Sequence, residues 1–200
     1  MRIYKVCHIS SVHKRLDVRI FHKECLSLSN NYYDVSLIID ANNEDISYAK
    51  KQNINIIKLY PVSGRVRRIL LQNYKCYREA LKLNSDIYHF HDPEFIPFGV
   101  LLKLRGKTVI YDVHEDVPMD IYNKDWIPLV ARRIISRLTY MIEHISAKYF
   151  LYIISATPHI LDRFRKANKK AININNYPLK KDIPDEVKFE NRNAYDICYI

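Results

Sequence analysis

Short runs of β-branched and aromatic residues alternate along this chain with longer segments in which apolar residues recur at helical spacing. Such runs are typical of buried strands, and the longer segments are typical of helices. The pattern predicts strands over residues 3–9, 34–39, 54–59, 86–91, 108–113, 152–155 and 171–175. It predicts helices over residues 20–28, 67–83, 93–104, 127–148 and from Thr157-Pro158 onward. This alternation indicates an α/β fold, a Rossmann-like doubly wound parallel sheet of about seven strands.

The predicted helices carry capping signals and apolar stripes. Asp17 is an expected N-cap for the first helix, and Asp92-Pro93 suits an N-cap followed by proline at the first helical position. The polar stretch between the second and third strands is left unassigned. The apolar stripe of the helix over 67–83 is predicted to consist of Leu70, Tyr74, Tyr77 and Leu81. The stripe of the helix over 127–148 is predicted to consist of Val130, Ile134, Leu138, Met141 and Ile145.

Polar side chains follow two of the predicted strands at the point where each strand ends. One segment reads His89-Phe-His-Asp-Pro-Glu94, and the other reads Tyr111-Asp-Val-His-Glu115. In open α/β sheets ligands bind at the carboxyl edge, where loops and helix N-termini converge. His89 and His91 alternate along one strand and therefore share a face of the sheet. The sequence thus predicts a site at this edge that includes His91, Asp92, Glu94, His114 and Glu115.

Three interpretations of these histidines compete. In the first, His89 is a core residue with its hydrogen bonds satisfied and Asp92 is a helix cap. In the second, His89, His91 and His114 bind a metal ion together with Glu115. In the third, His91 and His114 hydrogen-bond a sugar hydroxyl or a phosphate.

The loop after the first strand favours an anionic ligand over a bare metal ion. With strand order 3-2-1-4-5, the loops after strands one and four flank the crevice of the sheet. The first of these loops, residues 10–19, is rich in hydrogen-bond donors and cations. Its candidate ligand-binding residues are Ser11, His13, Arg15, Asp17 and Arg19. A phosphorylated sugar would use this loop, whereas a zinc site would not need it. The dinucleotide fingerprint G-x-G-x-x-G is absent, which argues against an NAD enzyme.

Composition is that of an ordinary globular domain. The 200 residues are 48% hydrophobic and 27% charged, enough for one α/β domain with a sizeable core. Apolar runs are too short for a membrane span, and the first residues read as a strand rather than a signal peptide. The four cysteines are scattered without a C-x-x-C pair. We therefore expect reduced thiols and a cytoplasmic protein.

The net charge of +10 suits nucleic acid, an anionic membrane surface or an acidic ligand such as a nucleotide sugar, and by itself does not choose among them. No zinc-finger spacing or RNP-like aromatic motif is present, so nucleic acid is not the expected partner. Contact with an anionic membrane at the inner face of the cell is a second hypothesis, and a solvated helix surface is its alternative. The cations that would make this contact are Arg68, Lys75, Arg78, Lys82, Arg133 and Arg137.

Four segments in this order resemble glycosyltransferase family 4. They are Val6-Cys-His-Ile-Ser-Ser-Val-His13, Asp17-Val-Arg-Ile-Phe-His-Lys-Glu24, His89-Phe-His-Asp-Pro-Glu94 and Tyr111-Asp-Val-His-Glu115. In that family they belong to the N-terminal domain of the GT-B fold. The similarity continues through Tyr177-Pro178 to the strand-like segment 196–200.

The resemblance implies a retaining transferase that uses a nucleotide-diphosphate sugar and neither a bound metal nor another cofactor. His91 matches the family histidine near the transferred sugar, and His114 with Glu115 matches the second cleft motif, so these three are the expected catalytic residues. Asp17 and Arg19 match the motif after the first strand. Many relatives carry glycines in that loop, whereas this chain has none, so contact there would come from Ser11, His13 or Arg15.

The resemblance also implies a division into domains. Residues 1–178 are expected to form the acceptor-side domain, and residues 179–200 a linker plus the first strand of a missing donor-binding domain. The expected acceptor is a glycan or a lipid-linked sugar in surface-polysaccharide synthesis, and the truncated chain is expected to be inactive alone. Two alternatives remain: a non-catalytic acceptor-binding subunit completed by a separate chain, and a metal-dependent hydrolase built on His89, His91 and His114.

Overall fold

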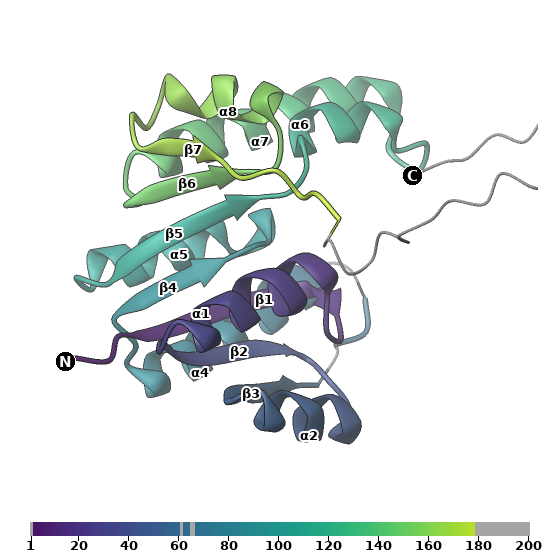
Figure 1. Ribbon diagram of the computed structural model, residues 1–200. Coiled ribbons are helices and arrows are strands. Elements are labelled where there is room, and N and C mark those ends of the chain that lie inside the picture. The colour runs from purple at the N-terminus through teal and green to yellow at the C-terminus, as the bar shows by residue number, and fades with distance from the viewer. Residues whose placement is uncertain (1, 61, 65–66, 179–200) are drawn as a thin grey trace, which may run out of the picture.

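A single parallel sheet forms the centre of the molecule, as Figure 1 shows for this computed structural model. The structure describes residues 2–60, 62–64 and 67–178, and the expected second-domain segment 179–200 lies outside them. The strand order is β3-β2-β1-β4-β5-β6-β7 with all neighbours parallel. The strands are β1 (Lys5–Lys14), β2 (Asp34–Asp40), β3 (Ile54–Leu59), β4 (Ile87–Phe90), β5 (Thr108–Val113), β6 (Tyr152–Ser155) and β7 (Ala171–Asn173). The predicted Rossmann-like doubly wound α/β fold is confirmed.

Helices cross between the strands on both sides of the sheet, with α1 in front and α4 and α5 behind in Figure 1. The crossovers after β1 and β2 are η1 (Val18–Cys25), α1 (Leu26–Asn30) and α2 (Asn43–Lys51). Those before β4 and β5 are η2 (Arg68–Gln72), α4 (Asn73–Leu83), η3 (Pro93–Phe95) and α5 (Ile96–Leu104). The remaining helices are α6 (Val117–Asp120), η4 (Ile121–Asn123), α7 (Leu129–Ala147) and α8 (Pro158–Arg165). None of the described helices is both long enough and apolar enough to cross a bilayer.

Two apolar clusters hold these helices against the sheet. Ile38 belongs to the cluster that includes α4, α5 and α8, whereas its neighbours Leu37 and Ile39 belong to the cluster under η1 and α2. This division follows from the alternation of side chains along a strand. Gly99 of α5 shows how tightly the first cluster packs, since a Cβ there would come within 2.8 Å of the Phe90 ring.

All three predicted helix starts lie where the structure has them. Asp17 caps η1, because its carboxylate accepts hydrogen bonds from the backbone amides of Arg19 and Ile20. Thr157 caps α8 through the amide of Ile160. Asp92 has the N-cap position of η3 with Pro93 directly after it, but its side chain makes no capping bond and binds the β1 loop instead.

Helix α2 fills the polar stretch that sequence patterning left unassigned. Its start is a capping box in which Asn42 and Asp45 exchange side-chain and backbone hydrogen bonds. The Asn-x-x-Asp spacing was the available signal. The helix is only nine residues long and buries just Asp45 and Ala49, so it shows little apolar periodicity.

The predicted apolar stripes of the two longest helices do not form the core. In α4 the stripe is half right: Tyr77 is buried, but Tyr74 is 48% exposed. The α4 face that packs on the sheet is formed by Asn73, Cys76, Tyr77 and Ala80. In α7 the predicted stripe is wrong throughout, because all five of its residues are at least half exposed. The buried residues of α7 are Ser136, Glu143, Ser146 and Ala147. Small and hydrogen-bonded side chains allow α7 to approach its neighbours closely, as when Ser136 Oγ donates to the carbonyl of Pro118.

Candidate active site

A pocket of about 230 Å³ lies at the carboxyl edge of the sheet, between the loops that follow β1, β4 and β5. This is the crevice at which the strand order reverses, where open α/β sheets bind ligands. Of the predicted site residues, six line it: His13, His91, Asp92, Glu94, His114 and Glu115. It is also lined by Val12, Pro93, Tyr111, Val117, Asp120 and Lys124.

Asp112 is the buried centre of the polar groups beneath this pocket. It lies two residues before His114, at the end of β5, and is fully buried. Its carboxylate accepts two hydrogen bonds from Arg19, 3.0 and 2.8 Å long, and one of 2.9 Å from His114 Nε2. Burial opposes ionisation, but the hydrogen bonds from His114, His91 and Arg19 outweigh it and hold the pKa of Asp112 well below its usual value. Asp112 is therefore an anion inside the protein.

The bond to Asp112 fixes the tautomer of His114. Because the ionised carboxylate can only accept, His114 Nε2 carries the proton and donates it. Nδ1 of His114 then holds a lone pair, and no hydrogen bond from the described residues reaches it. The ring lines the pocket and its side chain is 14% exposed. His114 is thus an oriented imidazole whose Nδ1 is the ring nitrogen open to a ligand in the pocket.

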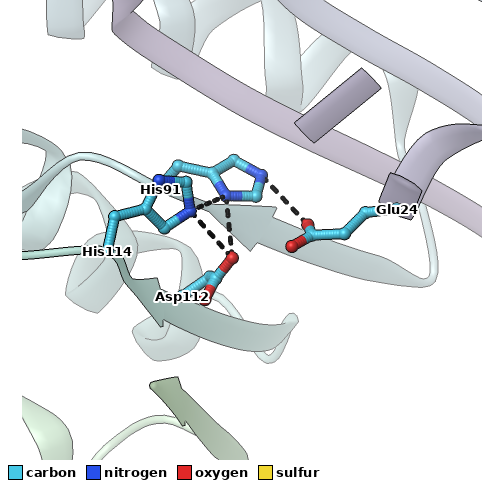
Figure 2. A group of neighbouring side chains, drawn as sticks. All are labelled: Glu24, His91, Asp112 and His114. Atoms are coloured by element: carbon cyan, nitrogen blue, oxygen red, sulfur yellow. Dashed lines mark hydrogen bonds and ion pairs between the residues drawn. The ribbon is translucent and has the colours of Figure 1, made fainter. Parts of the chain in front are cut away.

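His91 is held by the protein at both ring nitrogens. Its Nδ1 lies 3.3 Å from Asp112 Oδ2, and its Nε2 lies 3.0 Å from Nδ1 of His8 (Figure 2 shows the Asp112 side). Burial lowers the pKa of His91, although the bond to Asp112 opposes this shift. The side chain is fully buried. His91 therefore supports Asp112 and His114 and has no ring nitrogen left for a ligand in this arrangement.

A second buried layer lies beneath His91. Glu24 of η1 reaches Arg19 at 3.2 Å, and its Oε2 lies 3.8–3.9 Å from nitrogens of His8, His89 and His91. Burial and the nearby charge of Asp112 raise the pKa of Glu24, and burial lowers the pKa of His89 to about 3. His89 Nε2, His8 Nε2 and Glu24 Oε2 have no hydrogen-bond partner among the described residues. The expectation that His89 is fully satisfied is therefore wrong.

The side chains that could hold a metal fall into two groups of close donor atoms. One group is Glu24, His91, Asp112 and His114, and the other is His8, Glu24 and His89. The ligand set expected for a hydrolase, His89 with His91 and His114, is thus divided between the two. Both carboxylates also carry an ion pair with Arg19. Nitrogen and oxygen donors suit zinc, but Arg19 already occupies a position beside both carboxylates.

Asp92 fastens the β1 loop to the start of the next crossover. Its Oδ2 accepts from the hydroxyl of Ser10 at 3.0 Å, from the amide of Ser11 at 2.5 Å and from the amide of Val12 at 3.2 Å. The hydroxyl of Ser11 donates to the same oxygen at 3.3 Å. Ser11 therefore belongs to the frame of the site and does not line the pocket.

His13 lies at the rim of the pocket between two carboxylates. Its Nδ1 lies 3.7 Å from Asp17, and its Nε2 lies 3.6 Å from Asp92. The carboxylate of Asp17 raises the pKa of His13, and the interaction depresses the pKa of Asp17. The ring lies 5.2 Å from that of His114, and the side chain is 29% exposed. His13 can therefore carry a positive charge near His114.

Two predicted residues of the β1 loop lie away from the pocket. Arg15, in a left-handed backbone conformation, pairs with Asp45 at 3.2 Å on the side of α2. Arg19 is buried between Asp112, Glu24 and the carbonyl of Ile174. Arg19 and Asp17 thus shape the site from below, whereas Arg15 is outside it.

The sequence analysis missed the buried half of the site. Asp112, Glu24 and His8 all occur in the quoted motifs but were not chosen as site residues. An acidic residue inside an otherwise apolar strand, as at Asp112, is the signal that could have identified the centre. The position of Glu24 depends on how η1 lies over β1 and β4, and no sequence pattern showed this.

Comparison with known proteins gives the fold. No family model and no curated protein matches the chain. Among solved structures it resembles sucrose-phosphate synthase from Thermosynechococcus elongatus, with a TM-score of 0.62 and 14% identity over 86% of this chain and 48% of that one. It also resembles HepE from Anabaena in complex with UDP-glucose, with a TM-score of 0.54 and 9% identity over 86% of this chain and 44% of that one.

A third match broadens the range of chemistry found on this fold. UDP-N-acetylglucosamine 2-epimerase from Rickettsia bellii has a TM-score of 0.53 and 12% identity, with 86% of this chain and 44% of that one covered. The chain therefore spans about half the length of the solved structures it matches. Its Rossmann-like sheet has the fold of one half of a GT-B glycosyltransferase. Membership of glycosyltransferase family 4 stays a prediction.

Proposed function

We propose that this chain is the acceptor-side half of a retaining glycosyltransferase that moves a sugar from a nucleotide-diphosphate sugar to a glycan or lipid-linked acceptor. The observation that carries the proposal is the Asp112–His114 pair at the crevice of a sheet with the GT-B half fold. A neutral histidine oriented by a buried carboxylate can accept the proton of a hydroxyl group, which glycosyl transfer to an alcohol requires.

Each residue then has a definite part in the reaction. The lone pair of His114 Nδ1 accepts a hydrogen bond from the attacking hydroxyl of the acceptor. Glu115, exposed at the pocket wall, accepts hydrogen bonds from other hydroxyls of the same sugar. His13, whose pKa is raised by Asp17, supplies positive charge toward the leaving diphosphate. His91 and Asp92 hold the frame within which these groups act.

The size of the pocket fits half of a binding cleft. At about 230 Å³ it is smaller than most complete ligand pockets, which are roughly 300–1,000 Å³. We assign residues 1–178 to the acceptor-side domain and residues 179–200 to a linker and the start of a donor-binding domain. That HepE, a structural match, binds UDP-glucose supports a uridine-diphosphate sugar as the donor to be tried first.

The proposal places the protein at the cytoplasmic side of the cell, where it acts in surface-polysaccharide synthesis and needs no metal cofactor. A transferase assay on the 200-residue chain, and on a version extended by the downstream coding sequence, tests the proposal. We expect radiolabelled sugar to pass from UDP-sugar to acceptor only with the extended protein. Release of an epimerised sugar nucleotide, or activity that depends on added zinc, would instead make this site an epimerase or a hydrolase. Full transfer by the 200-residue chain alone would contradict the division into domains.

A further inference from the structure

Helix α7 presents a continuous apolar surface to solvent. Five of its residues, named here the α7 face, are 50–77% exposed: Val130, Ile134, Leu138, Met141 and Ile145. A soluble domain normally turns such a stripe toward its core. The acidic content of the helix is equally unusual, because Glu143 is its only acidic residue and is buried in an ion pair with Arg163. The exposed surface of α7 therefore combines apolar side chains with arginines and has no carboxylate of its own.

Beside the α7 face lies a cationic groove of about 650 Å³ between α6, α7 and α8, which we name the α7 groove. It is lined by four cations: Arg133, Arg137, Arg163 and Lys166. Two carboxylates also line it, and one of them, Asp116, is paired with His159 at 3.4 Å. The groove therefore carries a net positive charge. It is also separate from the candidate active-site pocket, since the two lie on opposite sides of the short helix α6.

Arg163 has hydrogen-bond donors in this groove that nothing satisfies. Its Nη1 is bound to Glu143, whereas Nε and Nη2 are buried without a hydrogen-bond partner among the described residues. Asp116 Oδ1 lies 3.6 Å from Nη2, too far for a hydrogen bond. Both atoms are inaccessible to solvent, so this edge of Arg163 lies below the surface of the groove. The groove cations that a lipid phosphate can reach are the exposed Arg133, Arg137 and Lys166.

We propose that the α7 groove binds the phosphate of an anionic membrane lipid while the α7 face lies in the headgroup region of the same membrane. An amphipathic helix with an apolar side and flanking cations binds anionic bilayers in two ways: its apolar side chains are buried in the membrane, and its cations are attracted to the lipid phosphates. The sequence analysis predicted a basic docking surface of six cations on two helices. Of these, the proposal keeps Arg133 and Arg137, and it adds their neighbour Lys166.

The charge pattern favours a lipid over a second copy of the chain. A symmetric dimer through the α7 face would bring Arg133 and Arg137 close to the same residues of its partner, with no carboxylate on the helix surface to balance them. An anionic bilayer supplies phosphates over the whole surface. The docking does not rest on the transferase reaction, although it would hold the neighbouring pocket near a lipid-linked acceptor.

Vesicle co-sedimentation of the full 200-residue chain tests this inference. We expect pelleting with phosphatidylcholine vesicles that contain roughly one third phosphatidylglycerol, and no pelleting with pure phosphatidylcholine, because the basic surface needs a negative surface potential. Arg133→Glu with Arg137→Glu should reduce the bound fraction about tenfold or more. The matched control is Lys50→Glu with Lys51→Glu, the same charge change on α2, and it should bind as the wild type does.

A second pair of variants separates the apolar contribution from the charge. Ile134→Ser with Leu138→Ser keeps every cation and should also reduce binding to anionic vesicles severalfold, without change in the circular dichroism spectrum. Equal losses in the α2 control, equal binding to neutral vesicles, or no binding at all would each overturn the proposal. So would a dimer in light scattering that the Ile134→Ser, Leu138→Ser variant dissociates, because the face would then bind a second copy. Saturable binding of inorganic phosphate with no vesicle binding would reassign the groove to a soluble anion.

Discussion

Asp112 of β5 and His114, the first residue after that strand, are joined by a contact of 2.9 Å between Asp112 Oδ2 and His114 Nε2. The carboxylate is fully buried and the imidazole lines the pocket, so the pair runs from the interior to the site. This geometry places the proton of the neutral His114 ring on Nε2 and leaves Nδ1 as its hydrogen-bond acceptor. The same carboxylate binds Arg19 and His91, which ties the chemistry of the site to the stability of the fold.

Replacement of the buried carboxylate should therefore destabilise the protein strongly. Asp112→Ala leaves the buried Arg19 guanidinium with only Glu24 and the carbonyl of Ile174 as partners, and breaking one side of a buried ion pair typically costs about 3–5 kcal/mol. Urea unfolding followed by circular dichroism gives the free energy of unfolding directly. Asp34→Ala, an exposed position at the start of β2, is the control and should change it by no more than about 0.5 kcal/mol. Equal losses in both variants would contradict the role assigned to Asp112.

The loop after β1 should loosen when Asp92 is replaced. Asp92→Ala removes the acceptor of the amides of Ser11 and Val12 and of the Ser10 hydroxyl, and hydrogen bonds to a charged group contribute about 1.5–3 kcal/mol. We expect a loss of about 2–3 kcal/mol and faster amide hydrogen exchange at Ser11 and Val12. Glu79→Ala, which removes a surface pair with Lys82, should leave both quantities nearly unchanged. Slow exchange that persists in Asp92→Ala would show that another group holds the loop.

The buried histidines should make the protein sensitive to mild acid. His89 has a pKa of about 3 in the folded state and about 6.5 when unfolded, so the unfolded chain takes up the proton first as the pH falls. The stability from the neutral ring is complete above about pH 6.5 and is lost progressively below it, by about 2 kcal/mol for this residue between pH 7 and pH 5. Unfolding free energies at the two pH values measure the effect. His89→Phe should reduce the change in unfolding free energy between the two pH values. An unchanged difference would contradict the role assigned to His89.

His13 should affect the pH dependence of stability in the opposite direction to His89. Its pKa is raised by Asp17, so the charged ring stabilises the folded state below the unfolded pKa of about 6.5, and this stability is lost as the pH rises through the folded value. A proton NMR titration of the His13 ring gives the pKa. In Asp17→Asn it should fall, whereas in Asp86→Asn, a distant control at the start of β4, it should stay where it is. If the two variants give the same pKa, the interaction with Asp17 is not its cause.

The packing of α4 can be tested with two tyrosines three residues apart. Tyr77 is 7% exposed and Tyr74 is 48% exposed, although the sequence pattern placed both on one stripe. Tyr77→Ala should cost about 3–5 kcal/mol, as for other large aromatic residues in cores, and Tyr74→Ala should cost much less. Similar costs at both positions would restore the stripe predicted from the sequence.

Strand positions were predictable from the sequence because alternating strands and helices leave a strong local pattern. Residues 54–59 and 152–155 were predicted with the bounds that the structure has. The stripes of α4 and α7 failed for a physical reason: helical periodicity locates an apolar face but does not say what covers it. In α7 the covered side is made of serines, an alanine and the paired Glu143.

The site was predictable at its surface and not below it. His114 and Glu115 stand at the end of a strand, where topology alone brings them to the crevice. His91 likewise stands at the end of a strand, β4, yet both of its ring nitrogens are bound by other side chains of the protein. The difference arises from the neighbouring strands, because His8 of β1 and Asp112 of β5 lie on either side of the His91 ring.

The transfer rate of the extended protein with His114→Ala tests the central claim most directly. Loss of a proton acceptor typically lowers kcat by about 100-fold or more, and we expect that loss with the acceptor still bound and the fold unchanged in circular dichroism. His144→Ala, a histidine on α7 far along the chain from the pocket, is the control and should transfer at the wild-type rate. Wild-type transfer by His114→Ala would contradict the account, because the Asp112–His114 pair would then have no part in the reaction.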